Sequence, residues 1–105
     1  MDGTSKLYEV IFSERAVDML IQHVRFLAQV SPEAAENLRS EIIAASKSLQ
    51  SFPERQLKFY DPLLPTNKYR KMIISKRYFL VYQIKAETVL IDYISDCRQD
   101  YQWLL

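Results

Sequence analysis

Glycine is almost missing from this chain. Its one glycine, Gly3, lies close to the start of a sequence of 105 residues. The loops that cradle phosphate groups, and the fingerprint of dinucleotide-binding folds, need backbone conformations that glycine adopts most easily. The sequence therefore excludes a nucleotide site of either kind.

Cysteine and histidine occur once each, as Cys97 and His23. A single cysteine forms no internal disulfide, which is typical of a reducing compartment. One cysteine and one histidine also exclude a zinc site with the usual four ligands. A serine–histidine–acid triad would have to use His23, and nothing around that residue resembles a nucleophile elbow. We therefore expect no metal and no cofactor, and any chemistry must come from Arg, Lys, Tyr, Asp or Glu.

Long hydrophobic runs are also lacking. No apolar stretch approaches the roughly 18 residues that a membrane-spanning helix needs, and the start does not look like a signal peptide. The length and the 49% of hydrophobic residues are those of one folded domain over residues 1–105. We expect a cytoplasmic protein in which residues 1–5 are disordered.

Positive charge is concentrated in one part of the chain. Residues 55–77 contain a single acid, Asp61, and a local charge of +6, whereas the whole chain has a formal net charge of +1. The basic residues of this segment are Arg55, Lys58, Lys68, Arg70, Lys71, Lys76 and Arg77. Such a cluster predicts an RNA or an acidic protein as partner. The alternative is that these side chains are solvated and prevent association through strand edges.

Hydrophobic periodicity and capping residues predict an α+β fold in the order β-α-α-β-β-β. Ser13 is a suitable N-cap for the first helix, and Ser31-Pro32-Glu33 has the pattern of a second helix start. The expected strands are 6–12, 69–75, 77–84 and 88–95, the helices are 13–30 and 32–52, the loop is 53–67, and the tail forms a short C-terminal element. We expect an antiparallel sheet with the helices packed as a hairpin on one face.

Each helix has an apolar stripe that predicts its buried side. The stripe of the first helix comprises Val17, Leu20, Ile21, Val24, Leu27 and Ala28, and that of the second Ala35, Leu38, Ile42, Ala45, Leu49 and Phe52. The opposite side of the first helix carries Met19, His23, Phe26 and Val30. This second set is either an interface for a partner protein or a surface that the second helix covers.

Three segments and their order resemble a known family. These are FPER (52–55), YRKMIISKRYFLVYQI (69–84) and ISDCRQDYQWLL (94–105). Together they resemble the RelE/ParE superfamily of toxins from bacterial type II toxin–antitoxin and plasmid stabilisation systems. The resemblance implies a co-expressed antitoxin, small and acidic, that binds the toxin, with a homodimer or a hetero-oligomer left open. We expect Met19, His23, Phe26 and Val30 to form the interface with this antitoxin. It also implies that the helices cover one sheet face and that the other is a working surface. Side chains alternate between the two faces of the expected strand 69–75. The working surface therefore carries one of two sets, either Arg70, Met72 and Ile74 or Tyr69, Lys71 and Ile73.

The superfamily divides by activity. Members similar to RelE cut mRNA on the ribosome, and the resemblance implies Arg70, Arg98 and Tyr101 as catalytic residues. Arginine would stabilise charge on the phosphoryl oxygens without a metal, and tyrosine would act as acid or base. Met72 and Phe79 stand at two positions that are usually basic in that branch.

We therefore expect a toxin that acts as a metal-independent mRNA endoribonuclease on the ribosome. The side chains expected to bind RNA or a partner are Lys68, Lys71, Lys76 and Arg77. Two alternatives stay open: a non-enzymatic ParE-like inhibitor of DNA gyrase, and an inactive relative that only binds its antitoxin.

Overall fold

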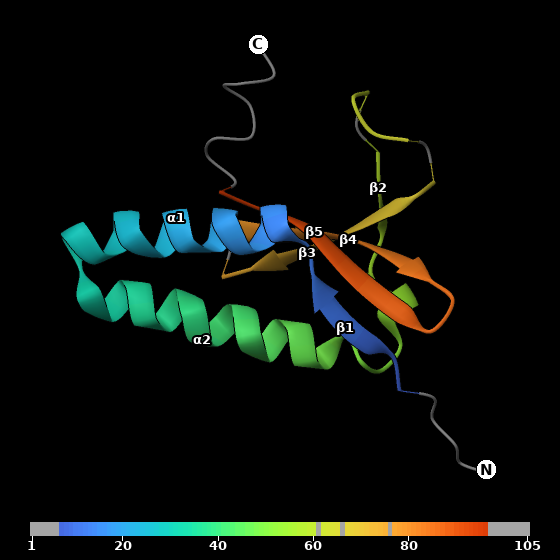
Figure 1. Cartoon of the computed structure of the whole chain (residues 1–105), viewed down its shortest axis with the longest axis horizontal. Helices are drawn as coiled ribbons and strands as arrows, with labels where there is room; N and C mark the ends of the chain where they lie inside the picture. Colours follow the sequence, from blue (N-terminus) through green and yellow to red (C-terminus); the bar gives the residue numbers. More distant parts are fainter. Residues whose placement is uncertain (1–6, 61, 66, 76, 97–105) are drawn as a thin grey trace.

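A computed structural model describes residues 7–60, 62–65, 67–75 and 77–96 of the chain. Figure 1 shows the two helices side by side as a hairpin against a twisted sheet. The elements are β1 (Glu9–Phe12), α1 (Glu14–Val30), α2 (Pro32–Ser48), the 3₁₀ turn η1 (Pro53–Arg55), β2 (Lys58–Phe59), β3 (Tyr69–Ile74), β4 (Tyr78–Lys85) and β5 (Thr88–Asp96). The predicted α+β class and element order are confirmed.

The sheet differs from the expectation in two respects. Its strand order is β1-β5-β4-β3-β2, so the short strand β2, which we expected to be loop, forms one edge. The other edge strand, β1, runs parallel to β5, while the remaining pairs are antiparallel. The sheet is therefore mixed. Between β1 and the later strands the chain passes through the helical hairpin, and this long connection allows β1 to lie parallel to the last strand.

Side-chain caps explain where the helices begin. The Oγ of Ser13 accepts a hydrogen bond from the N–H of Ala16 at 3.0 Å, and the Oγ of Ser31 accepts one from the N–H of Ala34 at 3.1 Å. Each cap satisfies a backbone donor that the first turn leaves unpaired. Both predicted helix starts are therefore confirmed within one residue.

The end of α2 was predicted wrongly. The helix stops at Ser48, and Phe52 adopts a left-handed conformation with φ 53° and ψ 55°. The Phe52 side chain is 70% exposed and is not part of the core, whereas the next residue, Pro53, is buried. The helix has ended and the backbone of Phe52 is left-handed, so the helical spacing no longer decides which way that side chain points.

The rarity of glycine has a visible consequence in the turns. Four non-glycine residues of the described chain have positive φ, namely Phe52, Asn67, Ser75 and Ala86. Such positions usually favour glycine, since a Cβ atom is unfavourable there. Tight connections such as those at Ser75 and Ala86 therefore form without the residue that would suit them best.

The main core lies between the helices and the sheet. Its buried members include Leu38 and Ile42 of α2 and Leu49 directly after that helix, with Leu80 and Tyr82 of β4. The inward face of α1 is rotated from the predicted stripe: Val17 and Ile21 are each 42% exposed and Ala28 is exposed, whereas Ala16 is fully buried. Apolar residues occur on both sides of α1, so periodicity alone did not determine which side faces the sheet.

Candidate partner-binding face

The sheet face that the helices leave uncovered, called here the outer face, has its own cluster of side chains. Tyr69, Phe79 and Val81 are its buried members, and Phe59, Leu64 and Tyr93 pack against them. Met72 and Ile74 belong instead to the main core on the helix side. Alternation along β3 therefore assigns Tyr69, Lys71 and Ile73 to the outer face and Arg70 to the opposite face.

Cations lie over aromatic rings on this outer face. The Lys71 ammonium lies 4.2 Å from the ring centroid of Phe79 and 5.1 Å from that of Phe59. The Lys68 ammonium lies 5.5 Å from the Tyr69 ring. Such contacts orient a cation without using its hydrogen-bond donors. Two of the four predicted partner-binding cations are thus brought to one face.

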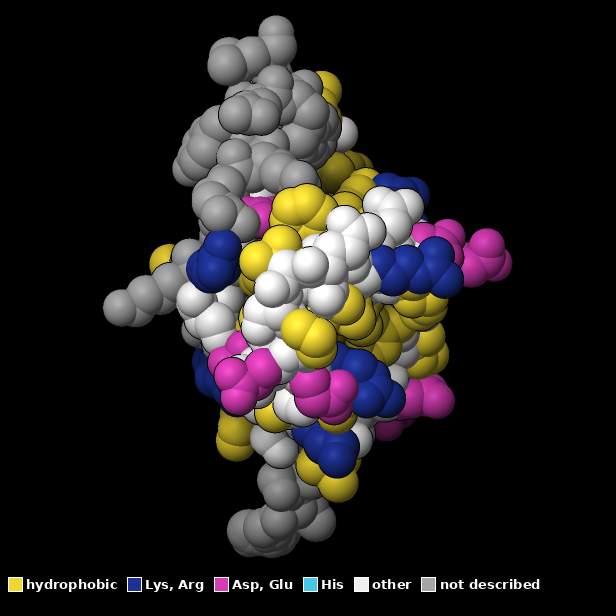
Figure 2. Space-filling model, turned by 90° about the vertical axis from the view of Figure 1, so that its left-hand side faces the viewer, with side chains coloured by type: hydrophobic (Ala, Val, Ile, Leu, Met, Phe, Trp, Pro, Cys, Tyr) yellow, Lys and Arg dark blue, Asp and Glu magenta, His cyan; other side chains and the backbone are white. Residues whose placement is uncertain are grey.

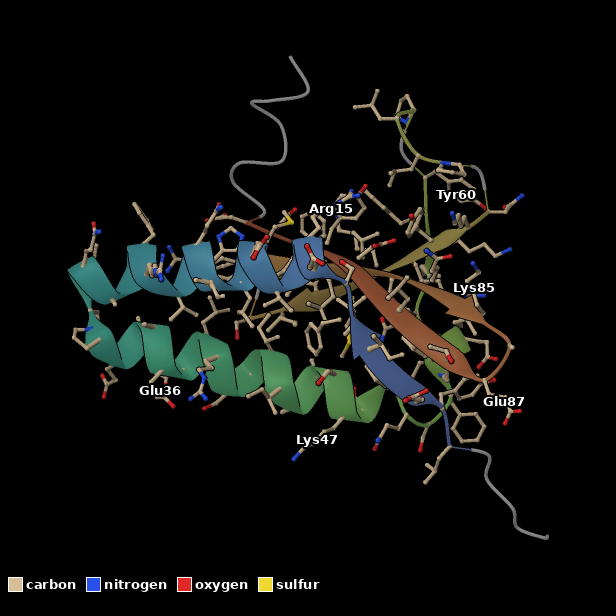
Figure 3. All side chains as sticks on the ribbon, viewed as in Figure 1. Arg15, Glu36, Lys47, Tyr60, Lys85 and Glu87 are labelled. Atoms are coloured by element: carbon tan, nitrogen blue, oxygen red, sulfur yellow. The ribbon has the colours of Figure 1, made fainter. Side chains whose placement is uncertain are left out.

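The first turn of α1 adds a third cation. The Arg15 guanidinium, labelled in Figure 3, lies 4.6 Å from the centroid of the Tyr93 ring. Tyr93 in turn makes an edge contact with Tyr69, with 6.2 Å between centroids. The start of α1 therefore borders the outer face, and sequence reasoning did not identify Arg15.

A partly buried polar network supports the aromatic rings. The register between β4 and β5 shifts after Val81, which leaves Asp92 between the pairs Val81–Tyr93 and Tyr82–Ile91. Its Oδ2 accepts hydrogen bonds from the Tyr69 hydroxyl at 3.0 Å and from Gln83 Nε2 at 3.1 Å. A bulge of this kind redirects a side chain. In the sequence, the signal for this bulge was Asp92, the single acid within the apolar strand TVLIDYIS.

Two tyrosines hold their protons well above neutral pH. Burial, followed by the hydrogen bond to Asp92, raises the pKa of Tyr69 to about 12. Burial also raises the pKa of Tyr82 to about 12. Both phenols stay protonated at physiological pH, so neither is suited to act as a general base.

Arg70 binds the protein's own backbone. Its Nη1 donates to the carbonyl oxygens of Glu54 at 3.0 Å and of Gln56 at 2.6 Å. The Tyr82 hydroxyl donates to the carbonyl oxygen of Pro53 at 2.6 Å. The FPER segment is therefore a turn fixed to the sheet by β3 and β4, and the predicted catalytic residue Arg70 is part of that attachment.

The other two residues of the predicted catalytic set, Arg98 and Tyr101, stay a prediction. Met72 packs against the main core, and Phe79 is 2% exposed on the other face. Arg98, Tyr101 and Lys76 lie outside the described residues, and Arg77 is exposed in the turn before β4. Among the described residues, no group of three or more His, Cys, Asp or Glu side chains could hold a metal ion.

The predicted interface stripe on α1 is divided between two environments. Met19 packs against the core, and His23 Nε2 lies 2.8 Å from the carbonyl oxygen of Ile94 while its ring contacts Tyr78 edge-on. Phe26 and Val30 are 61% and 77% exposed. The four residues therefore do not form one exposed face, because Met19 and His23 turn toward the sheet.

The end of the molecule formed by the helical hairpin has mixed chemistry. Figure 2 shows basic and acidic side chains interspersed there with hydrophobic ones. No large area of one sign gathers on the side that faces the viewer. This end does not have the electrostatic character of a polyanion site.

No helix among the described residues is both long enough and apolar enough to span a bilayer.

These features define a small α+β protein with a helical hairpin on one sheet face and a cation-bearing aromatic surface on the other. Residues 10–101 match the sequence model of the family described as the ParE toxin of the type II toxin–antitoxin system parDE. The chain therefore belongs to the ParE toxin family of type II toxin–antitoxin systems. An antitoxin is accordingly its partner.

Solved structures resemble the fold. A chain described as the chromosomal ParDE TA system from P. aeruginosa has a TM-score of 0.70 and 15% identity, covering 88% of this chain and 98% of that chain. The conserved hypothetical protein HP0894 from Helicobacter pylori has a TM-score of 0.60 and 13% identity, covering 88% and 97%. At these identities the likeness concerns the fold alone. No curated protein matches the sequence.

Proposed function

We propose that this toxin arrests growth by binding a protein target and not by cutting mRNA, with DNA gyrase as that target. The observation that carries the proposal is the position of Arg70. Its guanidinium is bonded to the carbonyl oxygens of Glu54 and Gln56. An arginine held in this way contributes to the fold, and its Nη1 is already bonded to two carbonyl oxygens before any phosphate arrives.

The outer face also suits a protein better than a scissile phosphate. Metal-independent cleavage needs several cations directed at the phosphoryl oxygens. On β3 and β4 the usually basic positions hold Met72 and Phe79, both packed among apolar neighbours. Aromatic side chains are enriched on surfaces that recognise proteins, and on the outer face they lie beside the ammonium groups of Lys71 and Lys68.

Tyr69 and Tyr82 are not suited to be the proton acceptors of a nuclease. The pKa values of Tyr69 and Tyr82 are raised to about 12, so these phenols do not supply a base near neutral pH. The nuclease alternative therefore depends on Arg98 and Tyr101, the other two residues predicted to be catalytic.

Substitution of that pair tests the proposal. Tyr101→Phe removes only a hydroxyl, and Arg98→Lys keeps the charge but loses the planar fork. We expect both variants to arrest growth as strongly as the parent, because binding a protein target does not require proton transfer. Colony counts after induction, in cells that lack the antitoxin, measure this. Relief of arrest by both variants, with antitoxin binding intact, would support the endoribonuclease instead.

A further inference from the structure

Phe52 combines an exposed aromatic ring with an unfavourable backbone conformation. Its φ of 53° and ψ of 55° are left-handed, and its side chain is 70% exposed. A side chain with a Cβ atom is unfavourable in that region, and the residue before a proline such as Pro53 is normally extended. The ring belongs to neither hydrophobic cluster of the described residues. Conformations of this kind concentrate at functional sites, where the surrounding structure holds them in place.

The turn that carries this ring is fixed by three side chains. The Tyr82 hydroxyl donates to the carbonyl oxygen of Pro53 at 2.6 Å, and Arg70 Nη1 donates to that of Glu54 at 3.0 Å. The Tyr8 hydroxyl donates to the Glu54 carboxylate at 2.9 Å. Removal of any one of these attachments would leave the other two. The ring therefore stands on a fixed base, and a partner that covers it orders little backbone in doing so.

A second exposed apolar side chain lies at the same end of the molecule. Leu7 is 64% exposed and directly precedes Tyr8. The N–H of Tyr8 donates to the carbonyl oxygen of Gln50 at 2.9 Å, so this part of the chain runs beside the segment that leads to Phe52. Large apolar side chains that gather on a surface mark an interaction site more strongly than a single one does.

The charged groups near this turn have both signs. The pKa of Tyr8 is raised by its hydrogen bond to Glu54, by burial and by the charges of Glu54 and Glu87, so both carboxylates lie near its hydroxyl. Figure 3 shows Glu87 at the end of the molecule away from the connection between α1 and α2. Arg55 is exposed, and its guanidinium donates to the carbonyl oxygen of Ser51 at 2.9 Å.

This combination fits a protein better than a nucleic acid. An aromatic side chain surrounded by polar groups is typical of the centre of a protein–protein contact. A nucleic acid selects a surface of positive charge, and the two carboxylates oppose its phosphates. They also oppose a strongly acidic protein, such as the antitoxin that we expect. The charge at this turn therefore favours the target of the toxin as the partner.

We propose that Phe52 anchors this toxin to its protein target, with the phenyl ring inserted into an apolar pocket of the target. Leu7 contacts the rim of that pocket. The inference rests on the proposed function, because the target is the gyrase named there. It adds the residue that makes the contact and the kind of site that receives it.

Phe52→Asn and Phe52→Gly test the anchor without disturbing the turn. Asparagine and glycine tolerate the left-handed conformation, so Tm in thermal unfolding should stay the same or rise. Both substitutions remove the ring. In a supercoiling assay with purified gyrase, the concentration of the chain that gives half-inhibition should therefore rise about tenfold or more.

Ile43→Asn is the control for loss of an exposed apolar side chain elsewhere. Ile43 lies on α2 and is 41% exposed. Its replacement should leave the half-inhibition concentration within about twofold of the parent's value. Calorimetry with the protein encoded by the adjacent reading frame measures antitoxin binding by the same variants.

The outcomes separate this inference from the proposed function. If the parent inhibits gyrase and both Phe52 variants inhibit it equally well, the inference is overturned and the proposed function stands. If the parent does not inhibit gyrase, the proposed function fails and the inference fails with it. Equal weakening by Ile43→Asn, or loss of the fold in both Phe52 variants, would also overturn the inference. Weaker antitoxin binding with unchanged inhibition would assign Phe52 to the antitoxin instead.

Discussion

Replacing Ile42 with alanine should lower the free energy of unfolding by about 3 kcal/mol. Ile42 is 0% exposed and lies in the core between α2 and the sheet. The substitution removes buried methyl and methylene groups and leaves a cavity that the surrounding side chains fill only in part. Urea denaturation with an unchanged m-value measures the change.

The neighbouring Ile43 provides the control for this prediction. It lies on the same helix and is 41% exposed. Ile43→Ala should therefore change the free energy of unfolding by less than about 1 kcal/mol, since the substitution removes little buried apolar area. If both substitutions lowered the free energy of unfolding equally, α2 would pack on the sheet through a different face.

Replacing Arg70 with methionine should lower the free energy of unfolding by about 2 kcal/mol. Methionine keeps the length of the aliphatic chain but removes two charge-assisted hydrogen bonds to the carbonyl oxygens of Glu54 and Gln56. The bond to Gln56 is partly buried, so in the variant water would only partly replace the hydrogen bond that the Gln56 carbonyl oxygen loses. At a temperature where the variant remains folded, growth arrest should persist.

Arg77→Met is the matched control for Arg70→Met. Arg77 is exposed in the turn before β4, so its replacement should change stability by no more than about 0.5 kcal/mol. The decisive comparison joins stability with toxicity. If Arg70→Met kept the parent's stability and abolished growth arrest, Arg70 would act on the target and not on the FPER turn.

Local signals were sufficient for much of the fold. Ser13 and the Ser31-Pro32 pair determine helix starts through their own backbone hydrogen bonds, and the sequence displays them directly. The strands β3, β4 and β5 follow from alternation and from short connections. Pairing of β1 with β5 was not predictable in the same way, because it joins residues about as far apart as the chain allows and has no local signal.

The candidate site shows where sequence reasoning stops. Alternation separated Arg70 from Lys71 but did not determine which of them lies on the outer face. That depends on packing of Met72 and Ile74 against the helices. The role of Arg70 depends on carbonyl groups 14 and 16 residues away in sequence. The register shift at Asp92 likewise arises from two strands together and not from either alone.

The most direct test of the central claim is a supercoiling assay with purified gyrase, relaxed plasmid and the purified chain. The account predicts that the chain inhibits supercoiling, that the protein encoded by the adjacent reading frame reverses the inhibition, and that mRNA in a parallel ribosomal translation reaction stays intact. Unimpaired supercoiling together with cleaved mRNA on the ribosome would contradict it.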